Sequence, residues 1–171
     1  GFITADPFIV NLLKNDFQQK NIHISTQQSI CNSKAALFWK RNGANRIVLA
    51  REVSYKELKL LLQNLDKQIE IEVFIHGAVC ISYSGRCTMS NNFSLRDANV
   101  GGCAQSCRWK YKIENPEIIH KDKYFTMSAK DMVQINNISN LLDLGIASFK
   151  IEGRMKSLHY IATVVNTYRK A

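Results

Sequence analysis

Short apolar runs alternate with amphipathic stretches along most of the chain. Runs rich in β-branched residues at 21–26, 45–50 and 69–77 predict strands. The stretches between them, 31–43 and 54–65, carry apolar residues at helical spacing and predict helices. This alternation predicts parallel strands whose faces are covered by helices.

The predicted strands recur at a constant interval. The first three begin at Ile22, Arg46 and Glu70, so the interval is 24 residues. The same interval separates two further predicted strands, which begin at Phe125 and Phe149 and enclose a predicted helix. A shortened strand at the start of the chain, followed by a helix, fits the same pattern and brings the expected number of strands to six.

Six strands are too few for a closed (β/α)₈ barrel, which has eight strands and about 250 residues. We therefore expect residues 1–171 to form a single α/β domain, a partial TIM-barrel-like (β/α) repeat corresponding to the C-terminal part of a barrel. A doubly wound open sheet is the alternative. The first residue is not Met, so we also expect a fragment or a processed chain.

The repeat is interrupted between Gly77 and Tyr124. Residues 78–123 have a sparse apolar pattern and contain four of the five cysteines. We expect this stretch to be a Cys-rich insertion after the carboxyl end of a strand. Barrel enzymes build their sites at that end of the strands.

The four clustered cysteines have the spacing C-x6-C-x15-C-x3-C, from Cys80 and Cys87 to Cys103 and Cys107. Four thiolates can hold a zinc ion or an iron–sulfur cluster. Neither pair has the tight CxxC form of a zinc knuckle, and this favours the larger [4Fe–4S] cluster. Free buried thiols and two disulfides are the alternatives. Cys31 stands apart and is expected to be a small buried or half-exposed residue.

The net charge of +9 favours an anionic partner such as RNA, a nucleotide or an acidic metabolite. Charge alone does not separate this from a generally basic surface. No apolar run approaches the roughly 18 residues of a membrane span, and we expect no membrane association. No phosphate-binding loop, dinucleotide fingerprint, HExxH helix or GxSxG turn is present, so the corresponding enzyme classes are unsupported.

Basic and aromatic residues gather around the cysteines and at nearby strand ends. This combination suits an RNA backbone with stacked bases, and the arginines would equally suit a small carboxylate such as prephenate. Alternatively, Arg86 and Arg108 only offset the negative charge of thiolates. The candidate substrate-binding residues are Arg51, Glu52, Tyr83, Arg86, Arg96, Arg108, Trp109 and Lys110.

Three further polar residues lie at predicted strand ends and are candidate catalytic groups. His76 ends one strand, and Glu152 and Arg154 follow another. Such positions hold site residues in barrels. The alternatives are charge pairing at the barrel rim for Glu152 and a structural role for His76.

Three stretches resemble a known family over nearly the whole chain. "HGAVCISYSGRC", "RDANVGGCAQSCRWKY" and "KIEGRMKS" are similar to motifs of the collagenase-like peptidase family U32. The resemblance implies a TIM-barrel-like domain with a [4Fe–4S] cluster on Cys80, Cys87, Cys103 and Cys107. Members of this family support hydroxylation, one branch at the wobble uridine of tRNA and another in ubiquinone synthesis. "CRWKY" directly after the fourth cysteine makes the tRNA branch the nearest.

The resemblance therefore implies a cytoplasmic protein for 5-hydroxylation of the tRNA wobble uridine, with an iron–sulfur cluster. The alternatives are a collagenase-like peptidase and a zinc-stabilised RNA-binding scaffold. Aerobic preparation can destroy such a cluster or leave zinc in its place. Two unpaired parallel edges in an incomplete barrel also predict a homodimer or strand exchange.

Overall fold

The computed structural model describes residues 1–18, 21–65, 69–112 and 124–171. The first part of the chain repeats one strand and one helix, as the apolar pattern predicts. Its elements are β1 (Phe2–Thr4), α1 (Pro7–Asn15), β2 (Ile22–Ile24), α2 (Ser33–Arg41), β3 (Arg46–Val48), α3 (Tyr55–Gln63) and β4 (Glu70–Ala78). Consecutive strands pair in parallel from β1 to β4.

Local sequence signals set the starts of these helices. Asp6 caps α1, whose first turn contains Pro7, and Asn32 caps α2 through the backbone N–H of Ala35. Ser54 and Glu57 form a reciprocal capping box at the start of α3. The expected helices are therefore confirmed at these positions.

The second part of the chain completes the sheet around the long strand β4. After α4 (Met89–Ser94), the elements are β5 (Asp131–Val133), α5 (Ile138–Asp143), β6 (Ser148–Glu152) and α6 (Leu158–Lys170). β6 pairs in parallel with residues 72–77 of β4. β3 and β5 share the opposite edge of β4, where β3 pairs with its first residues and β5 with its last.

Two expectations for this part are wrong. No strand begins at Phe125, because residues 125–128 form a turn and the strand lies at 131–133. That strand is antiparallel to β4, whereas the repeat predicted parallel pairing throughout. The physical reason is that β3 ends at Val48 and leaves the final residues of β4 unpaired on that edge. A returning chain can satisfy those backbone groups in either direction.

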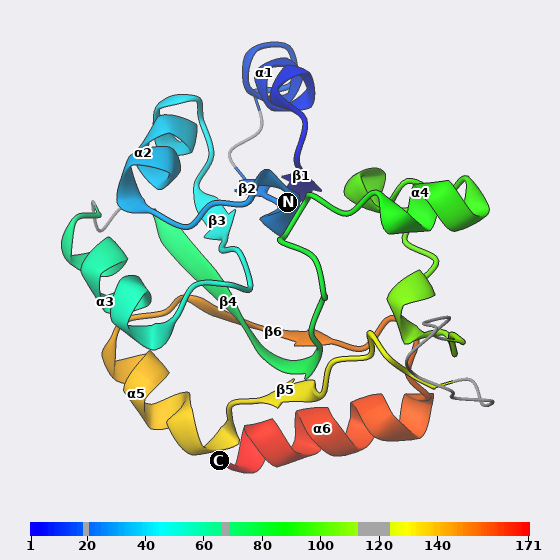
Figure 1. Cartoon of the computed structure of the whole chain (residues 1–171). Coiled ribbons are helices and arrows are strands. Elements are labelled where there is room, and N and C mark those ends of the chain that lie inside the picture. The colour runs from blue at the N-terminus through cyan, green and yellow to red at the C-terminus, as the bar shows by residue number, and fades with distance from the viewer. Residues whose placement is uncertain (19–20, 66–68, 113–123) are drawn as a thin grey trace.

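The core is a continuous set of apolar side chains between the sheet and its helices. Ile22, Ile24 and Ile47 are completely buried. In Figure 1, α1, α2, α3, α5 and α6 lie around the outside of the strands, and α4 lies apart from them. The result is a mixed α/β fold with a mainly parallel sheet, open between β1 and β6 in the described residues.

Residues 79–112, called here the cysteine segment, have a different character. They contain α4 and two short 3₁₀ turns, Ala98–Val100 and Ser106–Arg108. A bridge between Tyr111 and Tyr124 ends the segment. Within the part of the chain that the structure describes, no helix has the length and apolarity needed to cross a membrane.

Candidate functional site

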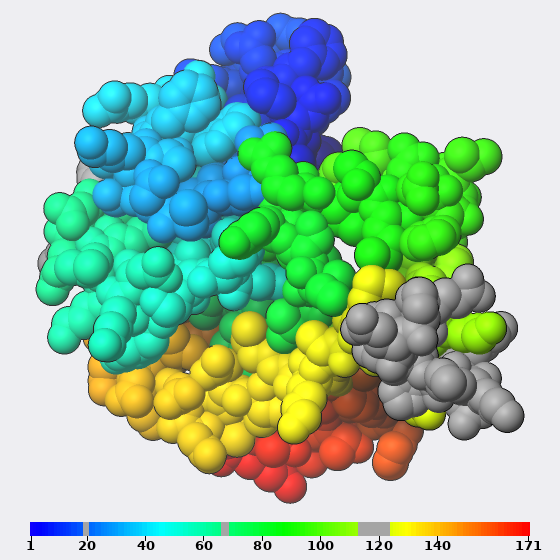
Figure 2. All heavy atoms as spheres, viewed as in Figure 1, coloured from blue at the N-terminus to red at the C-terminus, as the bar shows by residue number. Residues whose placement is uncertain are grey.

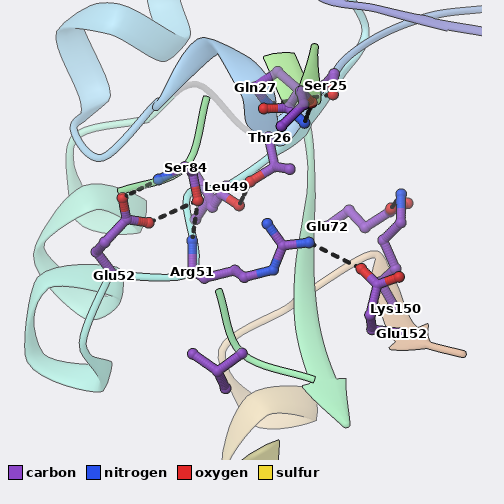
Figure 3. Close-up of polar contacts among 12 residues, drawn as sticks. Ser25, Thr26, Gln27, Leu49, Arg51, Glu52, Glu72, Ser84, Lys150 and Glu152 are labelled. Atoms are coloured by element: carbon purple, nitrogen blue, oxygen red, sulfur yellow. Dashed lines mark hydrogen bonds and ion pairs between the residues drawn. The ribbon is translucent and has the colours of Figure 1, made fainter. Parts of the chain in front are cut away.

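Ser84 forms hydrogen bonds that connect the start of the cysteine segment to the chain just after β3. The backbone N–H of Ser84 donates to Oε1 of Glu52 at 2.6 Å, and its hydroxyl donates to Oε2 at 2.8 Å. The same hydroxyl accepts the backbone N–H of Arg51 at 3.2 Å (Figure 3). Ser84 is 2% exposed although Glu52 is exposed, and the three bonds hold the segment against the chain that follows β3.

A glycine allows the segment to approach the chain after β2. Gly85 has φ +71°, and a Cβ at this position would lie 1.8 Å from the carbonyl oxygen of Gln27. Only glycine combines this backbone conformation with so close an approach. The side chain of Gln27 donates to the carbonyl of Ala98 at 3.2 Å. The turn after β2 therefore contacts the segment on both sides of α4.

A buried serine joins the two cysteine-bearing parts of the segment. The hydroxyl of Ser90 donates to the carbonyl of Arg96 at 2.7 Å and accepts the backbone N–H of Ala104 at 2.9 Å. Ser90 follows Cys87 closely in sequence, and Ala104 is next to Cys103. These bonds bring together Cys87 and Cys103, which are separated by 15 intervening residues.

All four clustered cysteines line one cavity of about 190 Å³. The surface of the molecule is hollowed between the chain that follows β4 and the block that contains α4 (Figure 2). Burial raises the pKa of the Cys107 thiol, and the charges of Cys80, Cys103 and Cys87 raise it further, while Arg108 opposes them. The four thiols are therefore close enough to interact electrostatically.

The thiols do not form a finished metal site in this conformation. All five cysteines lie in described residues and all are free, so disulfides do not account for the cluster. Among the described residues, no three His, Cys, Asp or Glu side chains stand ready to hold a single metal ion. Cys31 is exposed, rather than buried or half-exposed as expected, and is not part of the cavity lining.

Two hydrogen-bonding features of the lining suit a sulfur-rich group. The hydroxyl oxygen of Ser106 is buried and has no hydrogen-bond partner. A hydroxyl of this kind can donate to thiolate or sulfide sulfur. Sγ of Cys103 already accepts the backbone N–H of Gln105 at 3.3 Å. Four thiols together with a free hydroxyl donor suit an iron–sulfur cluster better than they suit a single metal cation.

An ion pair lies beside the thiols. The guanidinium of Arg51 contacts Oε2 of Glu152 at 2.9 Å (Figure 3). It also lies over the ring of Phe74, 4.0 Å from the ring centre. Arg51, Glu152 and Arg154 line the same cavity as the cysteines. Tyr83 and Arg108 line it too, so the structure brings five of the predicted site residues together with all four predicted ligands.

Arg108 connects the cysteine segment to the chain before β5. Its guanidinium donates to the carbonyl of Val79 at 2.7 Å, to Oγ of Ser128 at 2.9 Å and to the carbonyl of Ala129. These bonds use most of its donors on protein atoms. Arg108 also lines a second, neighbouring cavity of about 480 Å³, together with Glu152 and Arg154.

His76 lies away from the thiols, between two tyrosines of α6. Its Nε2 is 2.9 Å from the hydroxyl of Tyr160, and its Nδ1 is 3.4 Å from that of Tyr168. The Tyr160 hydroxyl also donates to Asp131 at 3.1 Å, and Lys156 contacts the same carboxylate at 2.7 Å. His76 is absent from the lining of the cysteine cavity, and its contacts are those of a packing residue.

The remaining candidate residues lie on the surface near the cavity. Tyr83 is 74% exposed and forms part of the rim. Arg86 and Arg96 are exposed, and Trp109 packs on Phe93 with ring centres 6.3 Å apart. The ammonium of Lys110 lies over the ring of Phe125, at 5.2 Å. These groups offer cations and rings to a partner near the cysteine cavity.

Sequence reasoning missed a buried carboxylate in the middle of the sheet. Glu72 lies 3.2 Å from Lys150 and 3.5 Å from Arg46, and it accepts the Ser148 hydroxyl at 2.9 Å. Burial alone would raise the pKa of Glu72, but Ser148, Lys150 and Arg46 outweigh it and the pKa is lowered. The available signal was a charged residue in each of three strands, Arg46 in β3, Glu72 in β4 and Lys150 in β6.

The sequence comparison connects this geometry with known proteins. A model of peptidase family U32 matches residues 1–171. The "tRNA hydroxylation protein P1" of Bacillus subtilis (strain 168) is 49% identical over 99% of this chain and 42% of its own length. The "23S rRNA 5-hydroxycytidine C2501 synthase" of Escherichia coli (strain K12) is 37% identical over 94% of this chain and 24% of its length.

Two further matches bear on function and fold. The "Collagenase" of Porphyromonas gingivalis (strain ATCC BAA-308 / W83) is 33% identical over 88% of this chain and 39% of its own length. The solved structure of the U32 peptidase Mk0906 has a TM-score of 0.50 at 13% identity, over 92% of this chain and 56% of that one. It supports the fold alone. The chain spans less than half the length of the curated relatives named here.

Proposed function

We propose a function from one premise: this chain belongs to peptidase family U32. The proposed activity is 5-hydroxylation of the tRNA wobble uridine by a cytoplasmic protein that holds a [4Fe–4S] cluster. Relatives named for hydroxylation of tRNA and rRNA support the reaction class. The observation that carries the cluster is the convergence of four thiols, from two parts of the segment, on one cavity.

Cys80, Cys87, Cys103 and Cys107 would hold the cluster, with the Ser106 hydroxyl as a donor to its sulfur atoms. When bound, such a cluster would supply electron transfer. The protein residues around it have separate tasks. Glu52 and Ser84 hold the ligand segment in place, and Arg51 with Glu152 forms a charged wall.

The surface near the cavity suits an RNA loop. Arg86 and Arg96 are exposed and make no ion pair within the described part of the chain. Tyr83, 74% exposed, offers a ring at the rim. Exposed cations beside rings bind phosphates and unstacked bases. A small carboxylate such as prephenate would fit the second cavity, which contains Arg108, Arg154 and Lys156.

The test is iron and sulfide analysis of the full-length protein prepared without oxygen. We expect about four iron and four sulfide per chain, and loss of both with Cys103→Ala. The matched control is Cys31→Ala, because Cys31 is free but outside the cavity. Uridine hydroxylation should be lost with the first variant and retained with the second. Equal iron in both variants, or stoichiometric zinc in the anaerobic protein, would overturn the cluster.

A peptidase is the second candidate, favoured by the collagenase relative. A Cys–His peptidase requires a thiol within hydrogen-bond reach of an imidazole. His76 instead contacts Tyr160 and Tyr168 and is not part of the cysteine cavity. Peptide hydrolysis that survives Cys103→Ala and disappears with His76→Ala would support this candidate over hydroxylation.

A further inference from the structure

A third cavity, of about 310 Å³, lies next to the cysteine cavity. Arg51 lines both, so the two share a wall. The third cavity lies at the carboxyl end of β3 and beside Val73 and Phe74 in the middle of β4, with α3 on one side and α5 on the other. Apolar side chains cover much of it, and its polar lining comes from Arg51, Tyr55, Gln134, Asn137 and Asn140.

The polar side of this cavity is built from amides. Nδ2 of Asn137 donates to Oε1 of Gln134 at 2.7 Å, so these two side chains hold each other in place. Asn140, one turn further along, makes no side-chain hydrogen bond with the described residues. Amide groups offer both donors and acceptors, as does the pairing edge of a pyrimidine base.

An aromatic ring and a cation complete the lining. Tyr55 lines the cavity and is 47% exposed, so part of its ring can be reached by a ligand. Nε of Arg51 is buried and lacks a hydrogen-bond partner, although the guanidinium pairs with Glu152. A buried N–H without an acceptor is unfavourable, and a ligand carbonyl would supply the missing acceptor.

We infer that this cavity binds the pyrimidine base extruded from an RNA loop and presents it across Arg51 to the cysteine site. The inference rests on the proposed function and adds a location for the base. Tyr55 supplies the stacking surface, the amides of Gln134, Asn137 and Asn140 read the pairing edge, and the apolar residues exclude water. The cavity volume is within the usual size of small-molecule sites.

The first experiment measures binding of a fluorescent RNA stem-loop to the full-length protein. One loop carries an unpaired uridine and the other has an abasic site at that position. Asn140→Trp should block the cavity from the exposed side of α5 and weaken binding of the uridine loop at least tenfold. Binding of the abasic loop should change less than twofold. Ser139→Trp, on the same helix but outside the lining, should leave both affinities unchanged.

The second experiment uses uridine 5′-monophosphate and does not depend on RNA binding or on hydroxylation. Calorimetric titration should detect the nucleotide with the wild-type protein and with Tyr55→Phe, which keeps the ring. The affinity for the nucleotide should be at least tenfold weaker with Tyr55→Ala and with Asn140→Trp. It should be unchanged with Asn136→Ala, because Asn136 is an exposed amide outside the lining.

The two inferences fail in different ways. One outcome is that the protein hydroxylates RNA, but Asn140→Trp changes the binding of both loops equally or of neither. The base would then not bind in this cavity, and the proposed function would stand. The opposite outcome is that Tyr55→Ala weakens nucleotide binding, but the protein hydroxylates no RNA. This would support the assignment of the cavity and refute the proposed reaction. No binding of either probe by the wild-type protein would overturn the cavity assignment.

Discussion

The strand–helix repeat and the cysteine segment are stabilised in opposite ways. The repeat buries isoleucines and leucines in a continuous core, with Ile22, Ile24 and Ile47 completely hidden. In the cysteine segment, the residues classed as buried are only Ser84, Ser90, Ala98 and Ser106. Its shape depends on directed hydrogen bonds to the scaffold, and a site of loosely packed thiols can therefore be reshaped by what it binds.

This difference predicts which mutations lower the stability of the whole domain and which lower mainly the retention of metal. Mutations in the repeat should lower the free energy of unfolding of the whole domain. Mutations in the segment should act mainly on the local opening of the cysteine site, because regions with few apolar contacts open independently. The following predictions test this separation, from the largest expected effect to the smallest.

Ile47→Ala should destabilise the whole domain by about 4 kcal/mol, because it leaves a cavity among completely buried side chains. Denaturant unfolding followed by circular dichroism measures the loss. Leu95→Ala is the control in the cysteine segment, where Leu95 is 90% exposed, and should change stability by less than about 0.5 kcal/mol. Comparable losses for both variants would contradict the division into two regions.

Gly85→Ala should displace the cysteine segment from the turn after β2. The added methyl would meet the carbonyl of Gln27 at 1.8 Å in a left-handed conformation, with an expected cost of about 3 kcal/mol. Hydrogen exchange should show early opening of residues 79–112, and iron retention should fall. Gly145→Ala also has positive φ but meets no atom within 4 Å, and it should cost only about 1 kcal/mol. Unchanged exchange in the segment would count against the close approach.

Glu72→Gln should destabilise the sheet by about 2 kcal/mol. The loss is smaller than for a fully buried pair because the Arg46 and Lys150 side chains are 25% and 34% exposed. The lowered pKa of Glu72 means that its contribution is present above the ordinary value of 4.5 and is lost as the pH falls below it. The stability difference between wild type and variant, measured by urea unfolding, should therefore shrink between pH 6 and about pH 3. A constant difference would show that Glu72 acts through packing alone.

Ser84→Ala should have the smallest effect on unfolding, about 1 kcal/mol, because it removes one hydroxyl bond to Glu52. Its effect on the site should be larger, since the same hydroxyl also accepts the N–H of Arg51. We expect faster loss of iron to a chelator at nearly unchanged melting temperature. Ser82→Ala, two residues earlier, is the matched control, and an equal rate for both variants would exclude the anchoring role.

Much of the repeat was predictable because its information is local. β-branched runs located β2, β3 and β4, and apolar residues at helical spacing located α2 and α3 within a few positions. The antiparallel strand β5 was missed, since the three residues Asp131–Val133 have little strand character of their own. Their conformation comes from the free edge of β4, which is remote in sequence.

The residues of the candidate site also differ in how far the sequence predicted their roles. The spacing of Cys80, Cys87, Cys103 and Cys107 indicated a shared site, and the structure places all four around one cavity. A position at a strand end made His76 a candidate for chemistry, and a place in the cluster of basic and aromatic residues made Arg108 one. The fold instead surrounds His76 with tyrosines and directs Arg108 to backbone carbonyls.

By itself, the sequence determined the strand–helix alternation, the helix starts and the identity of the clustered thiols, because periodicity, capping and side-chain chemistry act over a few residues. Only the tertiary structure decided the direction of β5, the pairing of Arg51 with Glu152 and the base-sized cavity beside the thiols. The residues concerned are up to 101 positions apart in the chain. Their meeting depends on how the sheet curves and packs, and no local pattern encodes that.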